Sequence, residues 1–177
     1  MIQVRKDTVQ AVYDYVVKSY EKVFLAAHIP DWQQLYLADG RMTIFCDGRM
    51  LGQTDLSVNS VYDTLSIPLT VEPRVVVKRI ETRNYKEQIS SKKEERTRSY
   101  EIKIKNNKEF PVSLTVKDQY PVSNTDEVEV TLTESSGAQV DGNTGMLTWK
   151  LELAPGAERI LKFGYAVRYP KGGTVYF

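Results

Sequence analysis

Apolar and polar residues alternate along most of this chain, in short segments that end at turn-forming residues. Tyr100, Ile102 and Ile104, for example, alternate with charged residues. Successive side chains of a β-strand point to opposite faces, so a period of two predicts strands with one buried and one solvated face. The pattern therefore predicts an all-β fold, with further strands in segments 112–116, 128–133, 147–153 and 160–169.

Turn-forming residues separate the predicted strands. Asp47-Gly48 lies between apolar flanks and predicts a β-hairpin, because both central residues of a type I′ turn need positive φ. Asn106-Asn107, Asp141-Gly142-Asn143 and Pro155-Gly156 mark further turns. Six or seven strands between residues 74 and 169 predict an immunoglobulin-like β-sandwich. The likeness is one of architecture, because the Cys–Trp–Cys signature of true immunoglobulin domains is missing.

The segment 9–27 fits two different structures. Its apolar residues, mostly Val and Tyr, recur at spacings of three and four, which is typical of an amphipathic helix. Both residue types lose side-chain freedom in a helix, and Tyr13, Tyr15 and Val17 also alternate as in a strand. We expect two strands, at about 9–17 and 22–29, and the family resemblance described below favours this choice.

Composition describes an ordinary folded protein. The 177 residues include 24 Lys and Arg, 23 Asp and Glu, one His and one Cys. A chain of this length can bury one good core or two small ones. We expect a smaller β-rich unit at residues 1–72 and an immunoglobulin-like β-sandwich at residues 73–177. The lone Cys46 excludes an internal disulfide, and no apolar stretch is long enough for a transmembrane helix.

The residues offer one enzymatic arrangement, Cys46 with His28. Pairing of segment 23–29 beside segment 42–47 would bring the two together, as nucleophilic catalysis requires. A reactive thiol also needs an electropositive, accessible setting, and the neighbours of Cys46 do not supply one. We therefore favour a half-buried hydrophobic role for Cys46 and keep a Cys/His hydrolase as a remote alternative.

Metal and cofactor chemistry has little support in the sequence. Two residues, one His and one Cys, cannot make a four-ligand zinc site. The acids in segment 126–129 fit a solvated strand face better than a calcium loop, and no glycine-rich phosphate loop occurs. We predict no catalytic residues, no cofactor, no metal and no enzymatic activity.

A basic segment is hidden inside the near-neutral total charge. Residues 74–108 contain 12 Lys and Arg against 5 Asp and Glu, whereas residues 1–73 and 109–177 each carry a net charge of −3. Cations gathered on one sheet face would attract a polyanion: nucleic acid, an acidic polysaccharide or lipid head groups. The near-neutral total charge argues against a dedicated nucleic-acid binder. The candidate polyanion-binding residues are Arg79, Arg83, Lys86, Lys92, Lys93, Arg96 and Arg98.

The basic segment also has a simpler interpretation, which we favour. Lys and Arg protect exposed strand edges against unwanted pairing, and five Glu residues interleave with the cations. Segment 85–98 contains almost no apolar residue apart from Ile89. It predicts either a long exposed loop or a protruding, twisted hairpin, a place where function often concentrates.

Two motifs in the second half are explained by geometry. Pro121 cannot donate to a β-ladder, so it ends a strand, and Asp118 is placed to cap the turn that follows. Trp149 alternates inward with Leu147 and Leu151, which predicts that it is the central core aromatic.

From residue 24 onward the chain resembles the C-terminal region, of unknown function, of the bacterial mucoidy inhibitor A-like family. The resemblance rests on seven blocks in order: FLAAHIPDW (24–32), FCDGRMLG (45–52), DTL (63–65), NNK (106–108), DQYPVS (118–123), GMLTW (145–149) and VRYPK (167–171).

The resemblance implies the C-terminal part of a longer protein that has an N-terminal β domain and a coiled-coil stretch. It implies a periplasmic or cell-envelope location, although residues 1–7 are not a secretory signal. The implied partners are the other domains of the parent chain, envelope proteins or acidic polysaccharide. The resemblance supplies no catalytic residues, so we predict a non-enzymatic structural or protein-interaction module.

Overall fold

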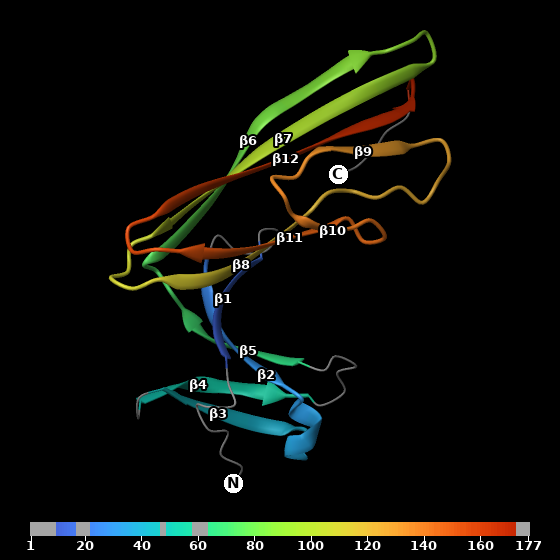
Figure 1. The fold of residues 1–177 in the computed structure, drawn as a ribbon. Coiled ribbons are helices and arrows are strands. Elements are labelled where there is room, and N and C mark those ends of the chain that lie inside the picture. The colour runs from blue at the N-terminus through green and yellow to red at the C-terminus, as the bar shows by residue number, and fades with distance from the viewer. Residues whose placement is uncertain (1–9, 17–21, 47–48, 58–63, 173–177) are drawn as a thin grey trace.

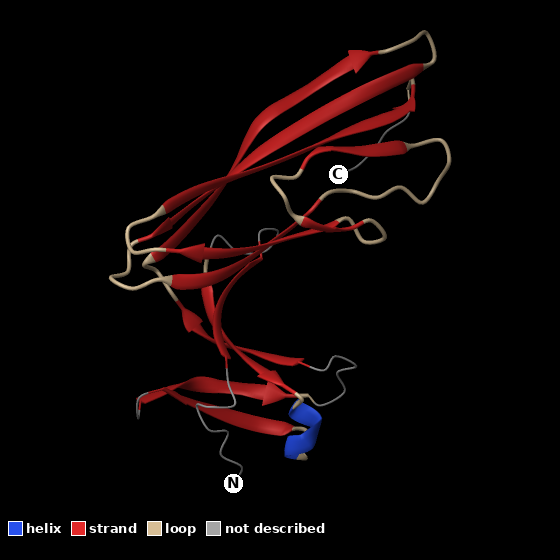
Figure 2. Ribbon diagram, in the orientation of Figure 1, coloured by secondary structure: helices blue, strands red, loops and turns tan. Residues whose placement is uncertain are grey.

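The computed structural model describes residues 10–16, 22–46, 49–57 and 64–172, which form β-strands and one short 3-10 helix (Figures 1 and 2). No helix in these ranges is long and apolar enough to cross a membrane. The elements in chain order are β1 (Gln10–Val16), β2 (Phe24–Pro30), η2 (Trp32–Leu35), β3 (Gly40–Cys46), β4 (Arg49–Leu56), β5 (Thr64–Val71), β6 (Val75–Gln88), β7 (Lys93–Asn106), β8 (Val112–Gln119), β9 (Glu129–Glu134), β10 (Gln139–Asp141), β11 (Met146–Leu153) and β12 (Glu158–Pro170).

The strands form three sheets, which confirms the all-β prediction. A six-stranded sheet has the order β10-β11-β8-β1-β2-β5, a four-stranded sheet the order β6-β7-β12-β9, and β3 pairs with β4. The two strands predicted in segment 9–27 are confirmed as β1 and β2. Their helix-like spacing is overridden by pairing, because β1 lies between β2 and β8 and bonds to both.

The four-stranded sheet packs on β8 and β11 to form the predicted β-sandwich (Figure 1). Its core contains Ile102 from β7, Phe163 from β12, and Val116 and Leu147 from the facing sheet, each without solvent exposure. Trp149 is buried 6.2 Å from Phe163, between ring centroids, which confirms its predicted core position. Its indole Nε1 donates to a backbone carbonyl, as a buried Trp requires.

A second apolar cluster lies where β2 and β5 meet the β3–β4 hairpin. Ile29, Trp32, Leu65 and Ile67 are buried there. The six-stranded sheet nevertheless joins both halves of the chain, because β1 pairs in parallel with β8. The division into units 1–72 and 73–177 stays a prediction.

Both predicted hairpins are present. β3 and β4 pair antiparallel on either side of Asp47-Gly48, although residues 47–48 lie outside the described ranges. The basic segment forms a hairpin of two 14-residue strands, β6 and β7, with a bulge at Thr82. Segment 85–98 is therefore the end of a protruding hairpin, and the alternative of a long loop is wrong.

A buried polar side chain, Asn106, connects two strand ends by hydrogen bonds. Asn106 is fully buried, and its side-chain amide lies 3.0–3.1 Å from three backbone carbonyls, those of Phe110, Leu153 and Ala154. These contacts connect the end of β7 to the end of β11 across the sandwich. The predicted turn at Asn106-Asn107 is thus a hydrogen-bonded junction as well as a change of direction.

We expect a methyl group at Gly145 to destabilise the fold more than one at Gly156. Both glycines have positive φ, +71° and +70°. A Cβ at Gly145 would lie 2.1 Å from the carbonyl oxygen of Tyr120, whereas a Cβ at Gly156 would meet nothing within 4 Å. Each alanine variant bears the left-handed penalty of about 1 kcal/mol, but the clash adds only to Gly145→Ala. Urea unfolding should show a loss at least about 2 kcal/mol larger for Gly145→Ala, and equal losses would contradict this account.

We expect Glu72 to make the fold acid-sensitive. Burial raises the pKa of its carboxyl, but hydrogen bonds from Lys108 and Arg74 outweigh burial and lower that pKa from 4.5 to about 2. A folded-state pKa below the unfolded one means that this stabilisation is present above pH 4.5 and is lost as the pH falls towards 2. The free energy of unfolding should therefore decline by on the order of 3 kcal/mol over this window.

Urea unfolding at several pH values measures this decline, and Glu72→Gln should flatten it. Glu158→Gln is the matched control, because Glu158 also pairs with a lysine, Lys105, but its side chain is 64% exposed. Exposed ion pairs contribute little to stability. An unchanged pH profile in Glu72→Gln would exclude the buried pair as the cause.

Candidate functional site

The seven predicted polyanion-binding residues do not meet on one face. Strand register and alternation place Arg79, Lys86, Arg96 and Arg98 on the inner face of the four-stranded sheet, which faces the other layer. The bulge at Thr82 turns the following residues of β6 over, so Arg83 lies on the outer face. Lys93 of β7 lies on the same outer face by alternation. Lys92 lies in the turn between the strands.

Three of the inner-face cations have partners on the same hairpin. Lys86 forms an ion pair of 2.7 Å with Glu94, and Arg98 lies 3.7 Å from Glu81. The Arg96 guanidinium donates to the amide oxygen of Asn84 at 3.2 Å. The interleaved acids therefore neutralise part of the positive charge where the cations are closest together.

Arg79 has a different position, between the two layers of the sandwich. Its Nε donates to the Asp118 carboxylate at 2.9 Å, and its guanidinium carbon lies 3.7 Å from the centroid of the Tyr100 ring. The Asp118 side chain has no solvent exposure. Arg79 therefore acts as the counter-ion of a buried carboxylate, which leaves it poorly placed to bind an external anion.

Asp118 was expected to cap a turn, and the structure corrects this role. It lies near the end of β8 with its side chain in the core, where it also accepts a hydrogen bond from the backbone N–H of Gln119. The sequence does contain a signal that the Asp118 side chain is buried. Val112, Leu114 and Val116 alternate inward, and Asp118 is the next residue in that series.

The aromatic side chains beside Arg79 belong to the same inner face. The hydroxyl of Tyr100 donates to Glu81 at 3.2 Å, and the rings of Tyr100 and Tyr165 have centroids 6.2 Å apart. Burial and the neighbouring Tyr100 raise the pKa of the Tyr165 hydroxyl far above its usual value. Tyr165 therefore stays protonated at neutral pH and is unsuited to act as a general base.

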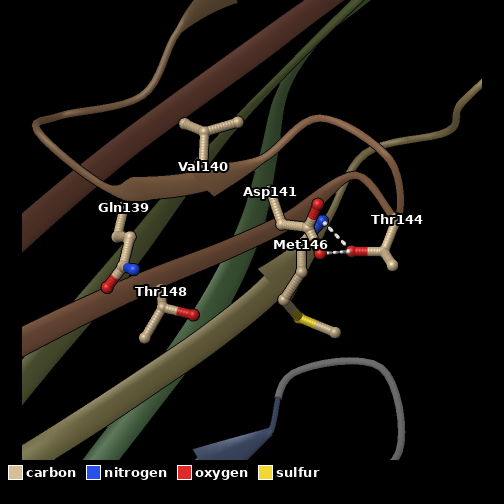
Figure 3. Close-up of a pocket in the computed structure, with 6 residues that line it drawn as sticks. All are labelled: Gln139, Val140, Asp141, Thr144, Met146 and Thr148. Atoms are coloured by element: carbon tan, nitrogen blue, oxygen red, sulfur yellow. Dashed lines mark hydrogen bonds between the residues drawn. The ribbon is translucent and has the colours of Figure 1, made fainter.

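An open depression of about 360 Å³ lies at the β10–β11 hairpin (Figure 3). Asp141 is the acidic residue that lines it, and hydrogen bonds from Thr144 and from the backbone of Asn143 lower the pKa of its carboxyl. These bonds use the carboxylate to shape the turn, as Figure 3 shows for Thr144. Within the described part of the chain, no group of three His, Cys, Asp or Glu residues could hold a metal ion.

The strand pairing that would join Cys46 and His28 is not formed. His28 lies on β2, which pairs with β1 and β5, whereas Cys46 ends β3, which pairs with β4. The expected neighbours are separated because β1 and β5 occupy both sides of β2. The structure supplies no strand contact that would place this thiol beside this imidazole.

The β3–β4 hairpin carries a surface that the sequence did not identify. Phe45 and Met50 are paired across the strands near the hairpin tip, and their side chains are 65% and 55% exposed. A register shift after Ile44 leaves Leu51 as the extra residue of a bulge, itself 39% exposed. We call Phe45, Met50 and Leu51 the hairpin tip. The alternation of the sequence could not show that this apolar pair faces outward.

Polyanion binding by the basic segment stays a prediction. Arg83 and Lys93 share the outer face, so Arg83→Ala with Lys93→Ala should lower the salt concentration at which the protein elutes from heparin. Lys150→Ala on β11 removes one exposed charge elsewhere and should change elution less. No retention of the wild-type protein at about 50 mM salt would contradict polyanion binding.

Comparison with known proteins gives a family but no activity. The chain matches the family described as "Domain of unknown function (DUF4139)" over residues 5–171. It is 24% identical over 172 residues to "Protein F37C4.5" of Caenorhabditis elegans, a match that covers 87% of this chain and 30% of the worm protein. The chain thus spans less than a third of the length of this curated relative.

The family match agrees with the expected resemblance to a domain of unknown function, whereas the mucoidy inhibitor A-like grouping stays a prediction. The match covers both sheets of the sandwich and the β3–β4 hairpin. This protein therefore belongs to the DUF4139 family of domains of unknown function.

Proposed function

We propose that this chain is a non-enzymatic interaction module of a longer protein, and that the hairpin tip is its contact surface. The observation that carries the proposal is the exposed cross-strand pair of Phe45 and Met50. Large apolar side chains are normally placed in a core, and exposed ones that cluster mark interaction sites.

The composition of the tip supports a protein partner. Aromatic residues and Met are enriched in protein–protein interfaces, because a ring contributes a large area at little entropic cost and a thioether adapts to irregular surfaces. The inner face of the same hairpin is already used, since Met42 and Ile44 pack on the second apolar cluster. Phe45 faces the other way, so the fold itself does not require a large apolar side chain there.

The described titratable side chains support a non-enzymatic role. Buried carboxylates are the usual candidates for acid–base catalysis, and here Glu72 and Asp118 are each held by a cation. Glu72 pairs with the buried Lys108 at 2.5 Å. Both carboxylates stabilise the fold and are not presented to a substrate.

We propose that the partner of the tip is another segment of the same longer polypeptide. The support is the length of the worm relative: the match covers 30% of it, so a protein of that length has further segments available to contact the hairpin tip. A location in the bacterial cell envelope is the further part of the proposal. It rests on the family resemblance alone.

A photo-crosslinking amino acid at position 45 of the protein, as its own cell produces it, tests the proposal. We expect crosslinks from position 45 to one peptide of the same polypeptide, outside residues 1–177, identified by mass spectrometry. The same probe at Thr43 is the control, because Thr43 also faces outward but is surrounded by polar neighbours such as Gln53. Crosslinks to a different protein, or equal yields at both positions, would overturn the proposal.

A stability measurement separates contact from folding. Phe45→Ser should change the free energy of unfolding by less than about 0.5 kcal/mol, because the side chain is mostly exposed. Ile44→Ser, one residue earlier and packed on the second apolar cluster, should cost about 2 kcal/mol or more. A large loss in Phe45→Ser would mean that Phe45 serves the fold.

A further inference from the structure

We infer that two copies of this chain pair antiparallel through the free edge of β6, so that their four-stranded sheets continue into each other. Among the described strands, β6 has β7 on one side and no strand on the other. An unpaired edge of this length is a template for a further strand. A second copy of this chain supplies that strand, and two features of β6 support this pairing.

The first feature is a row of apolar side chains on the outer face of the edge. Val76, Tyr85 and Ile89 are 48%, 41% and 44% exposed, and Ile80 is partly buried among them. The bulge at Thr82 shifts the alternation, so that even positions before it and odd positions after it share this face. When two copies of β6 pair antiparallel, their outer faces coincide only if an even-numbered residue before the bulge lies opposite an odd-numbered residue after it.

The second feature is a mismatch of charge inside the hairpin. Lys78 lies opposite Lys103, and Glu87 lies opposite Glu95. Like charges directly opposite each other on one face destabilise a pair of strands. Neither Lys78 nor Glu87 forms an ion pair with another described residue. Lys103 and Glu95 of β7 have acidic and basic partners of their own, Glu101 and Arg168. The β6 edge thus presents one positive charge, Lys78, towards one end and one negative charge, Glu87, towards the other.

One register of the two β6 strands provides partners both for the exposed apolar residues and for the charges of Lys78 and Glu87. A twofold axis between Thr82 and Arg83 places Lys78 opposite Glu87 of the partner subunit, and by symmetry this ion pair forms twice. The same register pairs Ile80 with Tyr85 of the partner subunit. It also brings Val76 opposite Ile89 of the partner subunit, the residue that directly follows β6. Every exposed apolar residue of the edge then meets another apolar residue.

Neighbouring registers lose this match. A shift by two residues in either direction keeps the faces together but moves Lys78 opposite Tyr85 or opposite Ile89. Both ion pairs are then lost and each charge lies against an apolar side chain. Charge complementarity therefore selects one register and, with it, one geometry of dimer.

The inner face tolerates the same register. It would place Arg79 opposite Lys86 of the partner subunit, two cations. Each is already paired with a carboxylate of its own chain, since Arg79 bonds to Asp118 and Lys86 bonds to Glu94. The like charges are therefore neutralised before the two strands meet.

Sedimentation of the purified protein from about 1 μM to 1 mM tests the inference, because this range covers weak and moderate dimers. We expect a concentration-dependent dimer. Lys78→Glu and Glu87→Lys should each raise its dissociation constant at least about tenfold, because each turns two attractive contacts into repulsive ones. The double variant exchanges the charges and should restore the dimer.

We expect the single variants to lose the dimer without losing the stability of the monomer fold. Lys78→Glu places an acid opposite Lys103, and Glu87→Lys places a base opposite Glu95, so each single change removes a repulsion within the chain. Thermal unfolding should therefore show unchanged or higher stability. Lys150→Glu, an exposed change on β11, is the matched control and should leave the dimer intact.

Two results would overturn the inference. One is a protein that stays monomeric at every concentration, as expected if the edge serves a different strand or none. The other is a dimer whose dissociation constant is unaffected by the single variants, or a double variant that fails to recover it. Either result leaves the proposed role of the hairpin tip untouched, because Phe45 and Met50 take no part in this interface.

Discussion

The architecture depends on one buried ion pair between the layers of the sandwich. A carboxylate without solvent exposure costs several kcal/mol unless it is paired, and Asp118 of β8 finds its partner in Arg79 of β6. The pair joins residues 39 positions apart and belongs to both sheets. It holds the first half of β6 against the core, with the guanidinium against Tyr100. The second half of β6 continues beyond this anchor, so its edge and its outer face stay available.

Strand alternation predicted most of this fold, and its failures have physical reasons. It identified the strands of the sandwich and the core position of Trp149, because both depend on a period of two. It could not predict that β1 pairs in parallel with β8, since that contact joins segments about a hundred residues apart. The same alternation could have predicted the buried position of Asp118, because Asp118 continues the inward series of β8. It could not predict that Arg79 is the ion-pair partner of Asp118, since nothing local distinguishes Arg79 from the other arginines of the basic segment.

The candidate surfaces were harder to predict than the fold. Local charge suggested one basic face, but strand alternation together with a bulge at Thr82 divides the cations between two faces. Phe45 faces away from the core because it alternates with Ile44, which packs on the second apolar cluster. The extra residue of β4, Leu51, then turns Met50 to the same outer face as Phe45. Single-residue insertions of this kind change which face a side chain occupies and leave the composition unchanged.

The two proposed surfaces are compatible with each other. The hairpin tip belongs to the β3–β4 sheet at one end of the molecule, and β6 runs towards the other end (Figure 1). A dimer through β6 would leave both hairpin tips exposed, so one assembly could hold two partner segments at once. Within one chain, Lys78 and Glu87 of β6 each lie opposite a like charge of β7, and the second copy would supply the opposite charge for both.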